Sequence, residues 1–180
     1  YVNGWGRCVM ATVISGSTGI TLPDNGSLST SVAGAMVIDS AGRVTTPNQP
    51  SFHAYPSGTT GNTNGAWLPF PCDNASHNIG NHYNTSTYTF TAPVAGVYQF
   101  NVSPRFDLVG VAYHAVRFYK NGVALSGAYS ISEAIGNYNT LNYSGAILLA
   151  ANDTIQPKLL CDSDGSWTVS SQGHFSGYLL

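Results

Sequence analysis

Histidine is the side chain in this sequence with the widest chemistry near neutral pH, because it can transfer a proton or bind a metal ion. His77 and His82 flank the segment Asn78–Asn81, so a single loop would present both rings. Such a pair fits a metal site, although polar loop residues at the surface share this pattern more often. The other histidines lie within strand-like runs, where we expect packed or interface side chains: His53, His114 and His174.

Acidic residues offer one further candidate site. The segment Asp162-Ser163-Asp164-Gly165 is the only acidic cluster, and Ca²⁺ takes several oxygen ligands. Asp162 and Asp164 are therefore candidate calcium ligands, although the other positions of an EF-hand loop are missing. Glu133 is the only glutamate, so a glycosidase pair would have to draw mainly on aspartates. No nucleophile elbow, zinc-protease motif or phosphate-binding loop occurs, and we predict a protein that is not an enzyme and needs no cofactor.

Aromatic residues make up 12% of the chain and include eleven tyrosines. Tyrosine and tryptophan combine a large apolar ring with a polar group, which suits both packed cores and recognition surfaces. Those near predicted loops are placed to stack on a sugar ring. With the two loop histidines they form the predicted receptor-binding set: Trp67, His77, His82, Tyr129, Tyr138 and Trp167.

The elements that would position these residues are β-strands. In the stretch from Tyr83 to Phe100, Tyr88 and Phe90 share one parity and threonines hold the other, which is typical of a half-buried strand. A second alternating run begins after Pro93 and Gly96, where the chain can reverse. No helical period of useful length appears elsewhere, so the sequence predicts an all-β sandwich.

This stretch also resembles a known family. The pattern Tyr88-x-Phe90-x-Ala92-Pro93-x-x-Gly96-x-Tyr98-x-Phe100 is similar to the signature of the globular head of complement component one, subunit q. That head belongs to the tumour-necrosis-factor-like jelly rolls. Further similar segments follow the family's order: Phe52-x-Ala54-Tyr55, Phe118 to Gly122, Ala151 to Ile155 and Phe175 to Leu180.

The resemblance implies a jelly-roll β-sandwich of about ten strands that assembles as a homotrimer. Several heads of this family carry calcium, which is compatible with the acidic cluster described above. The motif aromatics would then serve core or trimer packing: Phe52, Tyr88, Phe90, Tyr98, Phe100, Phe118 and Phe175.

Composition excludes some partners. Charged residues are 8% of the 180 residues and the net charge is −2, so the chain lacks a basic footprint for nucleic acid. No run reaches the roughly 18 apolar residues of a membrane span. The three cysteines, Cys8, Cys72 and Cys161, fit no zinc spacing. We expect buried thiols, with a Cys72–Cys161 disulfide as the alternative.

Residues 1–47 differ from the remainder. The segment Gly19–Leu28 alternates into a Pro-Asp-Asn-Gly turn, and Met36–Val44 reads as strand, turn and strand. Isolated hairpins are marginally stable, so these units need partners. They resemble stalk segments of bacteriophage tail fibres, in which three chains wrap together. With prolines at 47 and 50, the predicted domains are a stalk over 1–47 and a head over 48–180.

These features favour a trimeric virion fibre head, the C-terminal part of a longer polypeptide. Its expected partners are a host cell-surface glycan or protein and other virion tail proteins, outside the cell and without membrane insertion. A secreted complement-like lectin is a second hypothesis, although residues 1–47 contain neither collagen-like repeats nor heptads. A third is a structural capsid or tail component, and a fourth is a fibre-borne depolymerase.

Overall fold

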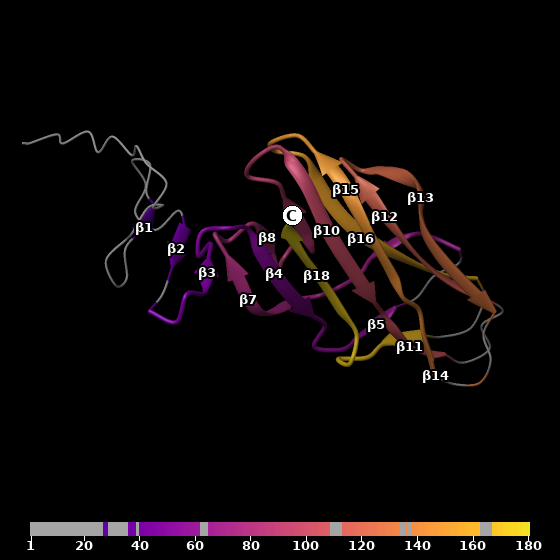
Figure 1. The fold of residues 1–180 in the computed structure, drawn as a ribbon. Helices are drawn as coiled ribbons and strands as arrows, with labels where there is room; N and C mark the ends of the chain where they lie inside the picture. The colour runs from indigo at the N-terminus through magenta and orange to yellow at the C-terminus, as the bar shows by residue number, and fades with distance from the viewer. Residues whose placement is uncertain are drawn as a thin grey trace, which may run out of the picture. The chain divides into compact units, whose positions relative to one another are not determined.

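The structure is a computed structural model. It describes residues 27–28, 36–38, 40–61, 65–108, 113–133, 136, 138–162 and 167–180. The chain divides into two compact units, Tyr1–Pro47 and Asn48–Leu180. All regular elements in the described ranges are β-strands, which confirms the predicted all-β class (Figure 1). No described helix has the length and apolar character needed to cross a membrane.

The described part of the first unit is a small antiparallel sheet. It contains β1 (Ser27–Leu28), β2 (Met36–Ile38) and β3 (Val44–Thr45), in the order β1-β2-β3. The turn between β2 and β3 includes Gly42 at a φ of +77°, a conformation that glycine adopts without steric cost. Strands therefore lie where the segment Met36–Val44 predicted them. Most of the predicted hairpin over residues 19–28 lies outside the described residues, as does Cys8.

One face of the second unit is a five-stranded sheet in the order β15-β10-β18-β4-β7. Its strands are β4 (Ser51–Tyr55), β7 (Asn74–Ile79), β10 (Gly96–Ser103), β15 (Tyr143–Leu149) and β18 (His174–Leu179). A four-stranded sheet in the order β14-β11-β17-β5 extends this one, because its strands follow the same order as β15, β10, β18 and β4. It contains β5 (Thr59–Gly61), β11 (Arg105–Leu108), β14 (Tyr138–Thr140) and β17 (Trp167–Val169). Pro104 separates β10 from β11 because proline cannot donate to the ladder.

The opposite face is a six-stranded sheet with the path β13-β12-β16-β9-β8, to which β6 adds beside β16. These strands are β6 (Leu68–Pro69), β8 (Tyr83–Asn84), β9 (Thr89–Thr91), β12 (Tyr113–Lys120), β13 (Val123–Glu133) and β16 (Thr154–Asp162). The described part of this unit thus holds 15 strands rather than about ten, because several long strands are interrupted. All pairings are antiparallel, as a jelly roll requires.

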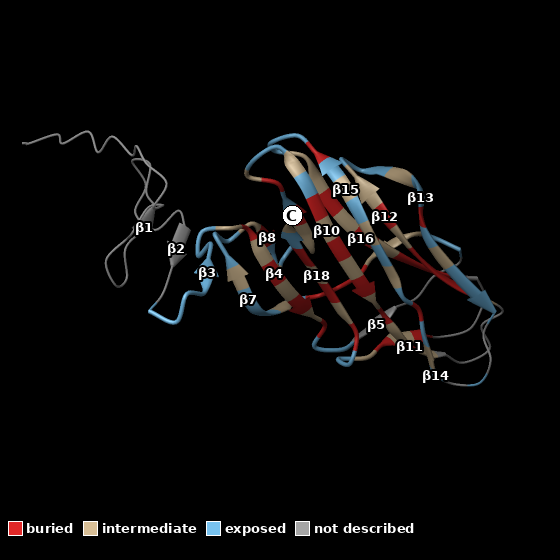
Figure 2. Cartoon of the chain, viewed as in Figure 1, coloured by how far each residue is buried: buried red, intermediate tan, exposed pale blue. Residues whose placement is uncertain are grey.

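Aromatic rings from both sheets form the core. The ring of Phe52 on β4 lies 4.8 Å from Tyr83, 5.2 Å from Phe90 and 4.9 Å from Phe175, measured between centroids. In Figure 2, buried positions alternate with less buried ones along β10 and β4, as expected for strands with one face in a core. Six of the seven predicted packing aromatics are buried: Phe52, Phe90, Tyr98, Phe100, Phe118 and Phe175.

Gly177 is needed beneath this aromatic cluster. A Cβ atom at this position would lie 2.5 Å from Cδ1 of Phe100 and 2.9 Å from Cε1 of Phe52, closer than carbon atoms pack. Glycine therefore lets the two rings rest directly on the backbone of β18.

Tyr88, the seventh predicted packing residue, is not in the core of the protomer. Residues 85–88 form a turn, in which Oδ1 of Asn84 accepts hydrogen bonds from the backbone N–H groups of Ser86 and Thr87. Tyr88 ends this turn at a φ of +57° and is half-buried. The turn breaks the predicted continuous strand, so Tyr83 takes the core position opposite Phe90 instead.

Cys72 and Cys161 are both buried and are not joined by a disulfide. Burial raises the pKa of the Cys161 thiol to about 12 and raises that of Cys72 further, so both remain protonated at physiological pH. The Cys72–Cys161 disulfide that the sequence left open is therefore absent. Buried protonated thiols behave as small apolar side chains, and neither of these two is a reactive group.

His114 is fully buried and packs edge-on against Phe106, with the ring centroids 5.0 Å apart. Neither of its ring nitrogens has a hydrogen-bond partner among the described residues. Burial therefore lowers the pKa of His114, and the ring is neutral in the folded protein.

We expect the protein to lose stability as the pH falls below about 6.5, the pKa of an unfolded histidine. Below that value the unfolded chain binds a proton that folded His114 excludes, so the free energy of unfolding decreases by up to about 2 kcal/mol at pH 5. Urea unfolding at pH 5 and pH 7.5 measures this difference. The His114→Leu variant should lose the larger part of it, and a His174→Gln variant a smaller part, because burial and neighbouring His53 also lower the pKa of His174. An unchanged pH dependence in His114→Leu would contradict this assignment.

Candidate recognition surface on the six-stranded sheet

The outward face of the six-stranded sheet brings together two of the predicted recognition residues. Trp67 precedes β6, and Tyr129 lies on β13. Their ring centroids are 6.0 Å apart, and Tyr119 of β12 lies 6.1 Å from Trp67. Side chains alternate across a strand, so Tyr119 and Tyr129 point away from the core that Phe118 and Ala128 face.

Two cations lie among these rings. Arg117 on β12 and Lys158 on β16 are directly opposite each other in the strand register. The guanidinium carbon of Arg117 is 5.5 Å from the centroid of Tyr129, and Nζ of Lys158 is 4.4 Å from that of Tyr119. Both distances allow cation–π attraction. We call this group the aromatic–cation surface: Trp67, Arg117, Tyr119, Tyr129 and Lys158.

The charge of this surface is not compensated. Neither Arg117 nor Lys158 forms an ion pair with any residue that the structure describes. Nε of Arg117 donates a hydrogen bond to the carbonyl of Leu125 over 3.3 Å, which leaves its two terminal nitrogens without a described acceptor. Like charges placed directly opposite on neighbouring strands repel each other. The pairing therefore costs stability, and an anion bound between the two cations would relieve that cost.

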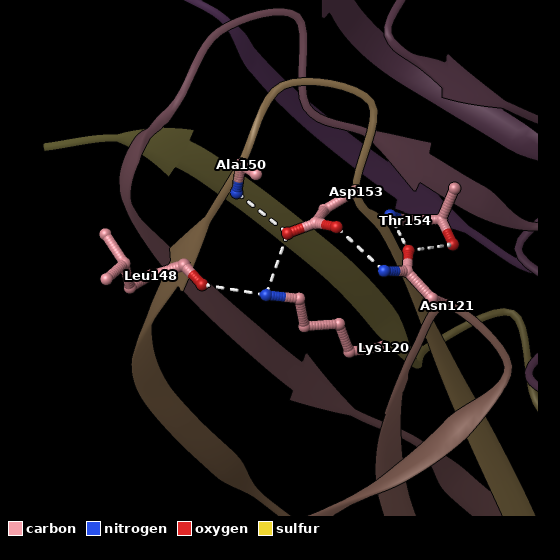
Figure 3. Close-up of polar contacts among 6 residues, drawn as sticks. All are labelled: Lys120, Asn121, Leu148, Ala150, Asp153 and Thr154. Atoms are coloured by element: carbon pink, nitrogen blue, oxygen red, sulfur yellow. Dashed lines mark hydrogen bonds and ion pairs between the residues drawn. The ribbon is translucent and has the colours of Figure 1, made fainter.

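A polar network fixes the end of β12, which carries two members of this surface (Figure 3). Nζ of Lys120 forms a 2.8 Å ion pair with Asp153, and Nδ2 of Asn121 donates a 2.7 Å hydrogen bond to the same carboxylate. Oδ1 of Asn121 accepts a 2.8 Å hydrogen bond from the N–H of Thr154. Hydrogen bonds from Lys120 and Asn121 lower the pKa of Asp153 to about 2, so the network stays intact over most of the acidic range.

We expect Asn121→Ala to be more destabilising than Asn121→Gly. Asn121 begins the turn between β12 and β13 at a φ of +52°, which glycine tolerates and alanine does not. Glycine should lose only the side-chain hydrogen bonds, about 1 kcal/mol, and alanine about 1 kcal/mol more. Denaturant unfolding of both variants measures the difference. Equal stabilities would mean that the backbone conformation at Asn121 is unstrained.

Two other predicted recognition residues lie elsewhere. Tyr138 is on β14, 66% exposed, with the guanidinium carbon of Arg105 4.9 Å above its ring. Trp167 is only 3% exposed, so its prediction as a receptor-binding residue is wrong. Its strand β17 pairs with β11 and β5 on both sides, and its ring faces the core 5.8 Å from Phe106.

The two histidines predicted to share a loop, His77 and His82, do not form a common site. His77 lies on β7, with its ring 6.3 Å from that of His53, which is in turn 5.3 Å from His174. The ring of His82 instead covers Gly80, where a Cβ atom would meet it. Within the described residues no three histidine, cysteine, aspartate or glutamate side chains are grouped to hold a metal ion. For the calcium prediction, Asp164 and the side chain of Asp162 lie outside the described part of the chain.

The outward face of the five-stranded sheet has a different character. Four large apolar residues are exposed near the C-terminal end of the chain, and we call them the apolar patch: Val97, Leu148, Tyr178 and Leu180. Val97 and Leu148 are register partners, and the backbone N–H of Leu180 donates to the carbonyl of Val97 over 2.9 Å. The four side chains are thus neighbours on one sheet face. Leu148, at 71% exposure, points outward between inward-facing Ile147 and Leu149, so an apolar residue occupies a position where alternation usually places a polar one.

Antiparallel sheets that pack face to face around an aromatic core define a jelly-roll sandwich. Residues 52–180 match the model of the C1q domain, and the chain belongs to the C1q domain family. The predicted resemblance of the head is thereby confirmed. Domains of the C1q and tumour-necrosis-factor-like group are generally non-enzymatic binding modules and are typically trimeric.

A solved structure shows the same fold. The crystal structure of murine APRIL at pH 8.5 matches with a TM-score of 0.56 and 12% sequence identity, covering 73% of this chain and 99% of that chain. The globular domain of zebrafish complement 1qA matches with a TM-score of 0.49 and 15% identity, covering 73% of this chain and 97% of that chain. No match was found among curated proteins.

Proposed function

We propose that this chain is the non-enzymatic, homotrimeric head of a virion fibre, specifically a bacteriophage tail fibre, which attaches the particle to a host cell surface. Membership of the C1q domain family supports the trimeric binding head. The stalk-like segments within residues 1–47 support the fibre. A secreted recognition domain of the same family is the second candidate, distinguished by a collagen-like or coiled-coil region that residues 1–47 do not contain.

The observation that carries the proposal is the apolar patch on the five-stranded sheet. Exposed apolar side chains that adjoin on a flat face are typical of protein–protein interfaces. Only 8% of the residues are charged, so few charges oppose association of identical copies. We assign the patch to contacts between three copies of the head, which would leave the opposite sheet face open to a receptor.

The proposed mechanism is adhesion without covalent chemistry. A trimer presents three identical recognition surfaces, and once one is bound the others act at a high effective concentration. Weak contacts at each surface thereby give firm attachment. The expected partners are a glycan or protein of the host surface and, through residues 1–47, other tail proteins of the virion.

Binding of the fluorescently labelled full chain to a panel of bacterial strains tests the proposal. We expect strong binding to a few strains, and binding at least about 100-fold weaker for a monomeric variant, since avidity is lost. If no strain binds the protein, or if monomer and trimer bind equally, the proposed function is wrong.

A further inference from the structure

The placement of cations in this chain is uneven. The whole sequence contains only six lysines and arginines. Two of them, Arg117 and Lys158, face each other across neighbouring strands, with no carboxylate partner among the described residues. The other two described cations of the head lie beside acids: Arg105 is 3.7 Å from Asp107, and Lys120 is 2.8 Å from Asp153. The aromatic–cation surface is thus the place in the described head where positive charge is left for an external partner.

We propose that the aromatic–cation surface binds an acidic saccharide, a sugar chain whose rings carry carboxylate groups. This inference rests on the proposed adhesion function and specifies the class of receptor. The cations would bind the carboxylate, and the aromatic rings would bind the apolar face of the sugar ring that carries it.

The chemistry of each group fits this ligand. The two terminal nitrogens of Arg117 are suited to a bidentate contact with a carboxylate, and Nζ of Lys158 adds a second positive charge beside it. Trp67 and Tyr119 are half-buried, so their rings are held in place while part of each remains accessible. Tyr129 is 39% exposed and adds a hydroxyl group for the sugar hydroxyls. Binding is non-covalent throughout.

Other anions fit less well. Nucleic acid is bound through broad basic surfaces that contact many phosphates, whereas this surface has two cations in a protein of net charge −2. An acidic peptide would use the cations but would leave the three aromatic rings without a matching apolar ring face. A saccharide that combines ring and carboxylate uses all five residues.

Isothermal titration calorimetry of the full chain with three probes tests this inference. The probes are a short galacturonate oligomer, its methyl ester, which keeps the rings but removes the charge, and a glutamate oligomer, which keeps the charge but has no sugar ring. We expect the galacturonate oligomer to bind at least about tenfold more tightly than either control, the factor of one charge-assisted hydrogen bond. Its affinity should also fall as salt is added, because the contact is partly ionic.

Variants locate the site. Arg117→Gln, Lys158→Gln and Trp67→Ala should each weaken galacturonate binding about tenfold while melting near the wild-type temperature. Arg105→Gln is the matched control, because Arg105 also lies over a tyrosine ring but has Asp107 beside it. It should bind like the wild type.

Several outcomes would overturn the inference. Equal binding of the methyl ester would mean that the carboxylate charge does not contribute to affinity. Equal binding of the glutamate oligomer would point to an acidic peptide partner. Binding that Arg105→Gln weakens as much as Arg117→Gln would place the site elsewhere. If a trimer attaches to cells but ignores all three probes, this inference fails while the proposed adhesion function stands; if the trimer attaches to no cells, the adhesion function fails as well.

Discussion

Replacing Leu148 by aspartate is expected to convert the trimer to monomers at micromolar concentration. Leu148 is 71% exposed in the single chain and lies next to Val97 in the apolar patch. In the proposed trimer this side chain is buried against a neighbouring copy, and threefold symmetry repeats the change three times. A carboxylate without a partner in an apolar contact is strongly unfavourable. We expect the dissociation constant to rise at least about 100-fold, which light scattering over a concentration series measures.

Val123→Asp is the matched control for this prediction. Val123 has the same 71% exposure but lies at the start of β13, in the six-stranded sheet. The two variants add the same charge to equally exposed positions on different sheets. If Val123→Asp dissociates the assembly and Leu148→Asp does not, the copies contact each other through the six-stranded sheet, and our assignment of the contact to the five-stranded sheet is wrong.

Replacing Phe52 by alanine is expected to have the largest effect on folding. Its ring contacts Tyr83, Phe90 and Phe175 at centroid distances of 4.8 to 5.2 Å and joins the two sheets. Removing a buried phenylalanine leaves a cavity and costs about 3–5 kcal/mol, a large part of the stability of a typical domain. Chemical denaturation of the variant measures this loss.

Phe52→Leu separates loss of volume from loss of ring contacts. It keeps most of the apolar surface, so it should cost clearly less than alanine. Tyr138→Ala removes an aromatic ring that is 66% exposed and should change stability by less than about 1 kcal/mol. A Phe52→Ala variant as stable as Tyr138→Ala would show that the aromatic cluster does not hold the sheets together.

Local sequence patterns predicted much of the fold. Alternation placed Phe90, Tyr98 and Phe100 on the core side, and burial of these three residues follows from that parity. The Asn121-Gly122 dipeptide is typical of a two-residue hairpin turn, and both residues take the positive φ values that such turns need. These features depend on neighbouring residues, which is why the sequence reveals them.

Two features of the fold were not predicted. The side chain of Asn84 accepts hydrogen bonds from two backbone N–H groups and starts a turn. Tyr88 therefore lies in this turn rather than in a strand, and Tyr83 occupies the core position. Trp167 was expected near a loop, but pairing of its strand on both sides buries the ring. The Asn84 turn is a local interaction that the strand alternation concealed, whereas burial of Trp167 depends on tertiary pairing that its local sequence does not reveal.

The candidate site was predicted only in part. Trp67 and Tyr129 were named from their residue type, whereas Arg117, Tyr119 and Lys158 were not. These three residues lie on the outward parity of β12 and β16, opposite to buried Phe118 and Leu159. That parity is readable in the sequence, but the pairing of β12 with β16 is not, and only this pairing brings the two cations together.

The mass of the full chain in solution tests the central claim most directly. Multi-angle light scattering at micromolar concentration should give three times the 18.9 kDa of one chain, because we assign the apolar patch to contacts between three copies. This mass should persist in high salt, since the proposed contact is apolar. A stable mass of 18.9 kDa would contradict both the assignment of the patch and the avidity on which the proposed attachment depends.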